Sequence, residues 1–184
     1  EAHIRVIRVD EKTVDIEVHT DDAWTLVPGI VFESGGGITE VGATATDTNF
    51  AGFGKKLWVE GIHKSDVGTN YAAGYNDPQV RNSWWQANTN FKTGPLIDVV
   101  NVSAIRPFYS PDTEWAFGGF ANWRSAETRL FENGDEVSRF HESSQGAQIF
   151  AARAFGPRYN KLTAEVQFVY DERHFDFTEG TPVR

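Results

Sequence analysis

The sequence lacks several features that would narrow its function at once. Cysteine is absent from its 184 residues, so no disulfide staples the chain, and a domain of this length does not need one to fold. Positive charge is scarce, because 17 Lys and Arg stand against 26 Asp and Glu, for a formal net charge of -9. An acidic chain gains nothing from counterion release, so we expect neither nucleic acid nor an anionic membrane surface as a partner. No apolar run approaches the length of a bilayer span, so we expect no transmembrane segment.

Methionine is also absent, which predicts that the initiator or a leader has been removed. Glu1-Ala2 is the pair that incomplete processing of a yeast secretion leader leaves, and we interpret it as such a remnant. Asn101-Val102-Ser103 is a glycosylation sequon, which makes Asn101 the candidate acceptor. Together these features predict a secreted protein.

Alternation of apolar and polar residues runs through nearly the whole chain. It is clearest from Leu162 to Tyr170 and from Val14 to Val18, and an Asn133-Gly134 pair between two such runs predicts a hairpin turn. No long amphipathic helix is evident, although a short helix or irregular loop fits residues 79–88. We therefore predict one all-β domain over residues 1–184, an antiparallel sandwich or barrel with little helix and a polar tail at 175–184. Aromatic residues make up 14% of the chain, which is enough for a sizeable core or a lined pocket.

Two aromatic segments are candidates for a binding site. The first joins residues 70–75 to residues 81–86, where Tyr75 and Trp84 stand among amides, one Arg and loop-forming residues. Such a mixture lines ligand pockets, because rings supply apolar contact while amides and Arg fix orientation. Core packing plus a solvated loop explains it equally well. Trp84 and Trp85 are adjacent, however, and adjacent residues of a strand point to opposite faces, so one of them lies outside a simple core.

The second segment runs from Ala104 to Tyr109 and continues at 115–124. Alternation places Arg106 and Phe108 on one face, and Trp115 and Phe117 together on another. An inward-facing Arg106 would need an anionic or carbonyl partner, whereas a surface Arg over a packed core would not. A third run, 148–155, places Phe150 on one side with small alanines, which leaves room for a ligand or for a second sheet.

Signals for metals, cofactors and common catalytic groups are missing. The five histidines show no metal-ligand spacing, no G-x-S-x-G elbow is present, and no glycine run precedes a Lys and a helix. We therefore predict no metal and no cofactor. One alternative stays open: with Glu1-Ala2 removed, His3 would be amino-terminal and would bind copper with His63 or His141, as in the lytic polysaccharide monooxygenases.

In general character the chain resembles the small secreted, glycosylated fungal proteins that catalyse hetero-Diels–Alder reactions in tropolone sesquiterpenoid biosynthesis. The shared features are the Asn101 sequon, the absent cysteines, the β pattern, and aromatic pocket candidates such as Trp84, Tyr109 and Trp123. The resemblance implies a cofactor-free cyclase (a pericyclase) that holds diene and dienophile in contact within a cavity. It carries over no catalytic residue.

From the residues we hypothesise a secreted protein with an aromatic-lined cavity for a small hydrophobic molecule. Arg106 would polarise a carbonyl, and Tyr75 and Tyr109 would donate hydrogen bonds. The ligand-binding walls would be built by five rings: Trp84, Trp115, Phe117, Trp123 and Phe150.

Two further classes stay open beside the copper oxidase. A carbohydrate-binding lectin would use exposed rings between Tyr71 and Trp85, and a membrane-acting protein of the actinoporin type would place such rings against lipid head groups. The substrate, the reaction and the oligomeric state are not fixed by the sequence.

Overall fold

A computed structural model describes residues 2–8, 14–20 and 24–178, and in these ranges the chain is almost entirely β-structure. The all-β, antiparallel class predicted from the alternation is confirmed. Residues 10–12, whose sequence Asp-Glu-Lys favours a hairpin turn, lie outside the described residues, as do Glu1 and the end of the polar tail. So does the side chain of His3, on which the copper alternative depends.

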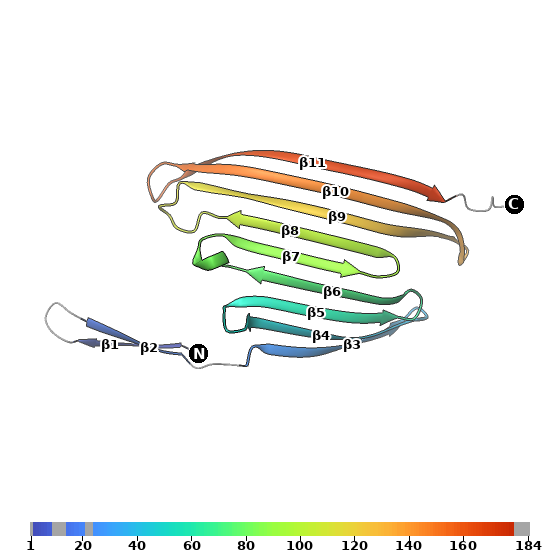
Figure 1. Cartoon of the computed structure of the whole chain (residues 1–184), viewed down its shortest axis with the longest axis horizontal. Helices are drawn as coiled ribbons and strands as arrows, with labels where there is room; N and C mark the ends of the chain where they lie inside the picture. Colours follow the sequence, from blue (N-terminus) through green and yellow to red (C-terminus); the bar gives the residue numbers. More distant parts are fainter. Residues whose placement is uncertain (1, 9–13, 21–23, 179–184) are drawn as a thin grey trace.

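The described strands form two sheets (Figure 1). A two-stranded sheet pairs β1 (Ala2–Arg8) with β2 (Val14–Thr20). The other sheet has nine strands, and their bounds are β3 (Leu26–Gly35), β4 (Ile38–Phe50), β5 (Lys55–Lys64), β6 (Gly68–Asp77), β7 (Gln86–Thr93), β8 (Ile97–Arg106), β9 (Trp115–Glu132), β10 (Asp135–Phe155) and β11 (Leu162–Thr178). A single 3-10 turn, η1 (Val80–Asn82), is the only helical element in the described part. None of the helical structure there is long and apolar enough to cross a membrane.

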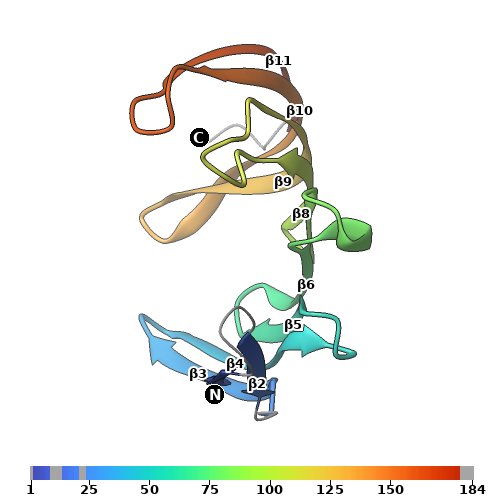
Figure 2. The same ribbon diagram turned by 90° about the vertical axis from the view of Figure 1, so that its left-hand side faces the viewer.

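The nine strands follow one another in space in the same order as in the sequence, so the large sheet is a continuous up-and-down meander. Its outer strands, β3 and β11, each pair with one neighbour only. Seen along the strands, the sheet curls into an open C (Figure 2). Four short turns join the strands at one end, which we call the hairpin end. The opposite end, the loop end, carries the connections 51–54, 78–85, 107–114 and 156–161.

Strict pairing gives the sheet two faces of different composition, because successive side chains of a strand point to opposite sides. One row of paired residues crosses seven strands and is uncharged: Leu57, Tyr75, Thr89, Val102, Ala121, Ala147 and Tyr170. The next row, one residue along each strand, carries amides and an acid: Trp58, Gly74, Asn90, Asn101, Asn122, Gly146 and Asp171. We call the sides that contain these rows the apolar face and the polar face.

The sheet has almost no buried core. The buried apolar residues of the described part are all alanines, and all lie on the polar face: Ala72, Ala116, Ala126, Ala152 and Ala154. Curvature crowds side chains on the inside of a sheet and spreads them on the outside, so the polar face is the concave one. The described residues do not form the sizeable aromatic core that the composition allowed, because none of them makes a second layer over the apolar face.

Most local predictions agree with the strands. Trp115 and Phe117 share a face, Phe150 shares one with Ala152 and Ala154, and Asn133 and Gly134 form the expected turn with φ of 52° and 94°. Phe108 does not share a face with Arg106 on one strand, because β8 ends at Arg106. Pro107 follows, and its ring removes the N–H that the ladder would need.

Candidate functional site

The apolar face carries an exposed, uncharged band across all nine strands. Ile30, Ile149 and Phe168 are 91%, 62% and 70% exposed, so large apolar side chains of this band face outward without a covering layer among the described residues. Along each strand no Asp, Glu, Lys or Arg separates the members of the band, although Asp47, Arg106 and Arg153 pair with members on neighbouring strands. Its members, in strand order, are Leu26, Pro28, Ile30 and Phe32; Val41, Ala43 and Ala45; Leu57, Val59 and Gly61; Tyr71, Ala73 and Tyr75; Ala87, Thr89 and Phe91; Val100, Val102 and Ala104; Trp115, Phe117, Gly119, Ala121 and Trp123; Ala147, Ile149 and Ala151; and Leu162, Ala164, Val166, Phe168 and Tyr170.

The band is tallest on β3, β9 and β11, and on the other six strands its three members span about 13 Å. From Leu162 to Tyr170 the strand advances about 26 Å, and from Leu26 to Phe32 about 20 Å, at about 3.3 Å per residue. Beyond it, charged and hydroxyl side chains return on the same face. Asp47, Lys55, Asp77, Arg106 and Arg153 mark the loop end, whereas His63, Asp98, Ser125, Glu127 and Glu172 mark the hairpin end.

The polar face is rich in amides and ion pairs. Asn90, Asn101 and Asn122 lie side by side in the centre of the sheet. Arg124 on β9 bonds Glu142 on β10 at 3.0 Å, and Lys64 on β5 pairs with Glu40 on β4. The sequon residue Asn101 therefore belongs to a mid-sheet row, and its glycosylation stays a prediction.

At the loop end, an ion pair joins β5 to β6. Lys55 Nζ lies 3.0 Å from Asp77 Oδ2, and Asp77 is buried. Burial raises the pKa of Asp77, but the hydrogen bonds from Lys55 and from the Gln79 backbone N–H outweigh it, so the pKa lies below the ordinary value. The hydrogen bond to Asp77 raises the pKa of Lys55 in turn. Both groups are therefore charged over a wide pH range.

Several residues predicted for a site do meet at the loop end, in what we call the aromatic–arginine cluster. The rings of Trp84 and Tyr109 stack with centroids 4.3 Å apart and planes 5° apart. Arg106 donates from Nη2 to Tyr109 Oη and from Nη1 to the Trp115 carbonyl, each at 3.1 Å. Its guanidinium also lies over the Phe117 ring, 5.3 Å from the centroid. The carbonyl partner of Arg106 therefore belongs to the backbone, and the hydrogen bond lies at an exposed position.

A surface hollow of about 420 Å³ adjoins Tyr109, and we call it the Tyr109 hollow. It lies between the 107–114 connection and the ends of β10 and β11. The residues that line it are Phe108, Tyr109, Ser110, Pro111, Thr113, Ala154, Lys161 and Thr163. Arg106 and Trp84 are not among them.

Three other predicted residues lie apart from this cluster. Tyr75 belongs to β6, and its hydroxyl donates to Asp77 at 3.4 Å. Phe150 is on the polar face, where its ring lies against Gly118. Trp123 is on the same strand as Trp115 but about 26 Å further along it, at about 3.3 Å per residue, so one small cavity does not contain both.

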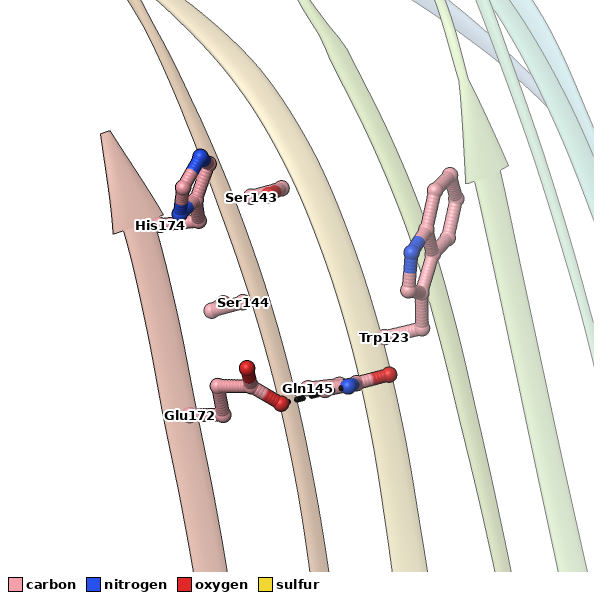
Figure 3. A pocket seen from close by; sticks show the side chains of 6 residues that line it. All are labelled: Trp123, Ser143, Ser144, Gln145, Glu172 and His174. Carbon is pink, nitrogen blue, oxygen red and sulfur yellow. Dashed lines mark hydrogen bonds between the residues drawn. The ribbon is translucent and has the colours of Figure 1, made fainter. Parts of the chain in front are cut away.

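Trp123 lines a separate hollow of about 160 Å³ near the hairpin end (Figure 3). Its other residues are Ser143, Ser144, Gln145, Glu172 and His174, from β10 and β11. Gln145 Nε2 donates to Glu172 at 2.8 Å, and the Tyr170 hydroxyl donates to the same carboxylate. Both hydrogen bonds lower the pKa of Glu172, and the one from Tyr170 has the larger effect. The hollow is small and polar, which does not suit an apolar substrate.

No cluster of three His, Asp or Glu residues within the described ranges has the geometry to hold a metal ion. Comparison of the chain with protein-family models, with curated proteins and with solved structures finds no match. Function must therefore be argued from the two faces, the two ends and the aromatic–arginine cluster.

Sequence reasoning missed the most extensive of these features, the continuous apolar band. The signal was present, since every strand that it recognised alternates. The sequence analysis placed the apolar face of each strand in a core or a cavity. It therefore did not predict that these faces form one continuous exposed surface.

Proposed function

We propose that this chain forms a membrane-embedded β-sheet, whose apolar face contacts lipid acyl chains and whose polar face borders a water-filled space. The observation that carries the proposal is the uncharged band across nine consecutive strands. The proposal follows the membrane-acting alternative of the sequence analysis, but the lipid contact comes from the sheet face and not from the Tyr71–Trp85 segment alone.

The size of the band supports lipid as its occupant. Nine strands at about 4.8 Å spacing make it roughly 38 Å wide, and with a height of about 13 to 26 Å its area is roughly 500 to 1,000 Å². Soluble monomers rarely expose contiguous apolar patches beyond a few hundred Å². On β9 and β11 the length of the band along the strand also approaches the apolar belt of about 25 Å that lipid-facing strands present.

The residues at the loop-end boundary of the band also support lipid as its occupant. Trp84, Tyr109 and Trp115 gather at the loop end, where the apolar band gives way to Arg106 and Arg153. Amphipathic rings and long cationic side chains are favoured at the boundary between hydrocarbon and head groups.

The proposal carries one structural requirement. Every backbone N–H and C=O group in hydrocarbon needs a hydrogen-bond partner. The outer edges of β3 and β11 pair with no strand in the described part. Further strands, from a longer chain or from other copies, must therefore pair with both edges in the membrane.

Flotation tests the proposal. The chain is diluted from urea into phosphatidylcholine vesicles, washed with carbonate at high pH and floated through a sucrose gradient. We expect it to float with the vesicles and to acquire β-structure, as seen by circular dichroism. A chain that folds in buffer and stays at the bottom of the gradient would overturn the proposal.

Two triple-serine variants make the test specific to one face. Ile149, Val166 and Phe168 on the apolar face are changed to Ser in the first variant. Gln148, Glu165 and Gln167, their neighbours on the polar face, are changed to Ser in the second. Flotation should fall several-fold in the first variant only.

We also keep, as a second proposal, the binding of a small hydrophobic molecule, with cofactor-free cyclisation as its most specific form. The Tyr109 hollow favours it, because Phe108 and Tyr109 line a space of about 420 Å³. Titration with an apolar fluorophore tests binding: Tyr109→Ala should weaken it at least tenfold, and an unchanged affinity would reject this hollow. Turnover that survives Arg106→Ala would remove Arg106 from the mechanism. Secretion stays a prediction beside both proposals.

A further inference from the structure

A second hollow at the loop end, next to the edge of the apolar band, is lined by cationic side chains. It has a volume of about 350 Å³ and lies between the 107–114 connection and the 156–161 connection. Arg153, Arg158 and Lys161 supply three positive charges to it, against the carboxylates of Asp112 and Glu114. The local charge is therefore positive in a chain whose formal net charge is -9.

The two arginines are only loosely held by these carboxylates. Arg153 Nη2 lies 3.9 Å from Glu114, and Arg158 Nη2 lies 3.5 Å from Asp112. All four side chains are largely exposed, and ion pairs of this kind contribute little. Lys161 Nζ donates to the Thr113 carbonyl at 3.3 Å, so it is directed toward the same connection. An incoming anion can replace these partners at small cost.

Rings position Arg153 at the boundary of the band. Its guanidinium lies 5.1 Å from the Trp115 ring centroid and 5.0 Å from that of Phe155. Trp115 is its paired neighbour on β9, and Ala164 is its paired neighbour on β11. Arg153 therefore lies where the hydrocarbon-facing part of β9 and β11 ends, and Arg158 and Lys161 line the same hollow.

We propose that this hollow, the cationic hollow, binds the phosphate of a phospholipid whose acyl chains lie along the apolar face of β9–β11. The inference rests on the proposed function and goes further by naming a ligand class and its site. A phosphate diester accepts hydrogen bonds from guanidinium and ammonium groups. The acyl chains extend from it over Phe155 and Leu162, which are exposed and paired across β10 and β11.

Titration of the detergent-solubilised chain with short-chain lipids tests the inference by calorimetry. The probes are dioctanoyl phosphatidylglycerol, dioctanoyl diacylglycerol without phosphate, and inorganic phosphate. We expect saturable binding of the phosphatidylglycerol, and at least tenfold weaker binding of the other two. Equal binding of inorganic phosphate would show a simple anion site, and failure of phosphatidylglycerol to bind would remove the site altogether. Either result overturns the inference.

Matched variants separate the site from general charge effects. Combined Arg153→Gln, Arg158→Gln and Lys161→Gln should weaken phosphatidylglycerol binding at least tenfold. Arg173→Gln removes an exposed arginine from the polar face of β11 and should change binding less than twofold. Equal losses in both variants would contradict a defined site.

Flotation distinguishes failure of this inference from failure of the proposed function. Vesicles of phosphatidylcholine alone capture the chain through the apolar face. If wild type floats but shows no saturable lipid binding, the inference that the cationic hollow binds a phospholipid is wrong, while the proposal of a membrane-embedded sheet is retained. If wild type does not float, the sheet proposal itself fails.

Discussion

The two faces of the large sheet are built from the same strands, yet they suit different surroundings. On the apolar face, the row of paired residues from Leu57 to Tyr170 crosses seven strands and contains no charged side chain. One residue along each strand, the polar face presents a row of amides that ends in Asp171. Alternation in this chain therefore distinguishes two exposed faces and not a core from a surface, because no described residues form a layer over either face. The membrane proposal requires such an arrangement.

The largest effect should come from a charge placed in the centre of the band. Ile149→Arg would put a guanidinium among Ala121, Val166 and Phe168. In vesicles we expect it to lower the free energy of unfolding by about 2–4 kcal/mol, since lipid-facing Arg costs that much near the bilayer midplane. Urea titration of the vesicle-bound chain, followed by tryptophan fluorescence, measures the change.

The adjacent residue supplies the control. Gln148→Arg lies on the polar face, where we expect a loss below about 1 kcal/mol, mainly from the hydrogen bond to Gln167. Equal losses at positions 148 and 149 would mean that the faces do not differ in their surroundings.

The next effect concerns packing on the polar face. Trp58 lies across Gly74, its paired neighbour, and a Cβ at Gly74 would overlap the indole. Gly74→Ala should therefore cost about 1–3 kcal/mol through overpacking and shift the Trp58 emission. On the apolar face, Gly61→Ala meets the Tyr71 ring only at ordinary contact distance, 3.4 Å, and should cost much less. Chemical denaturation compares the two, and a reversed order would contradict the packing described.

A pH-dependent effect should appear at the loop end. Asp77 has a folded-state pKa below its ordinary 3.8, so its stabilising contribution is present above that value and is lost as pH falls through the folded pKa. Lys55 has a pKa raised above 10.5, so its contribution is lost only as pH rises through that raised pKa. The stability difference between wild type and Asp77→Asn should be constant from about pH 5 to 10. Carboxyl carbon NMR of Asp77 provides the direct titration, and a midpoint above 3.8 would refute the assignment.

The smallest effect belongs to the ion pair between Arg124 and Glu142 on the polar face. This pair lies at 3.0 Å but is partly exposed. In contact with water, Arg124→Gln should cost at most about 1 kcal/mol and less in high salt. A loss of several kcal/mol, measured by urea titration in low and high salt, would mean that water does not reach this face.

Much of the strand pattern was predictable, because alternation is a local property. Leu162–Tyr170 and the Asn133-Gly134 turn were identified from neighbouring residues alone. The local pattern did not predict β6, since Gly68–Asp77 contains Gly, Asn and Asp, which are depleted in strands. Pairing with β5 and β7 overrides that local preference.

The site was less predictable than the strands. Arg106 and Tyr109 are close in sequence, and their contact follows from a short loop. The stacking of Trp84 on Tyr109 joins two different connections and depends on the meander bringing them to one end. A search for long apolar runs does not detect the apolar band, because its apolar residues recur at every second position.

Nitroxide scanning tests the central claim most directly, and the cysteine-free chain makes each introduced cysteine unique. Four variants each carry one cysteine, at position 148, 149, 167 or 168. The cysteine is spin-labelled, and accessibility is measured in the vesicle-bound protein. The account predicts high oxygen and low nickel-chelate accessibility at positions 149 and 168, and the reverse at 148 and 167. Equal nickel-chelate accessibility at all four positions would contradict it.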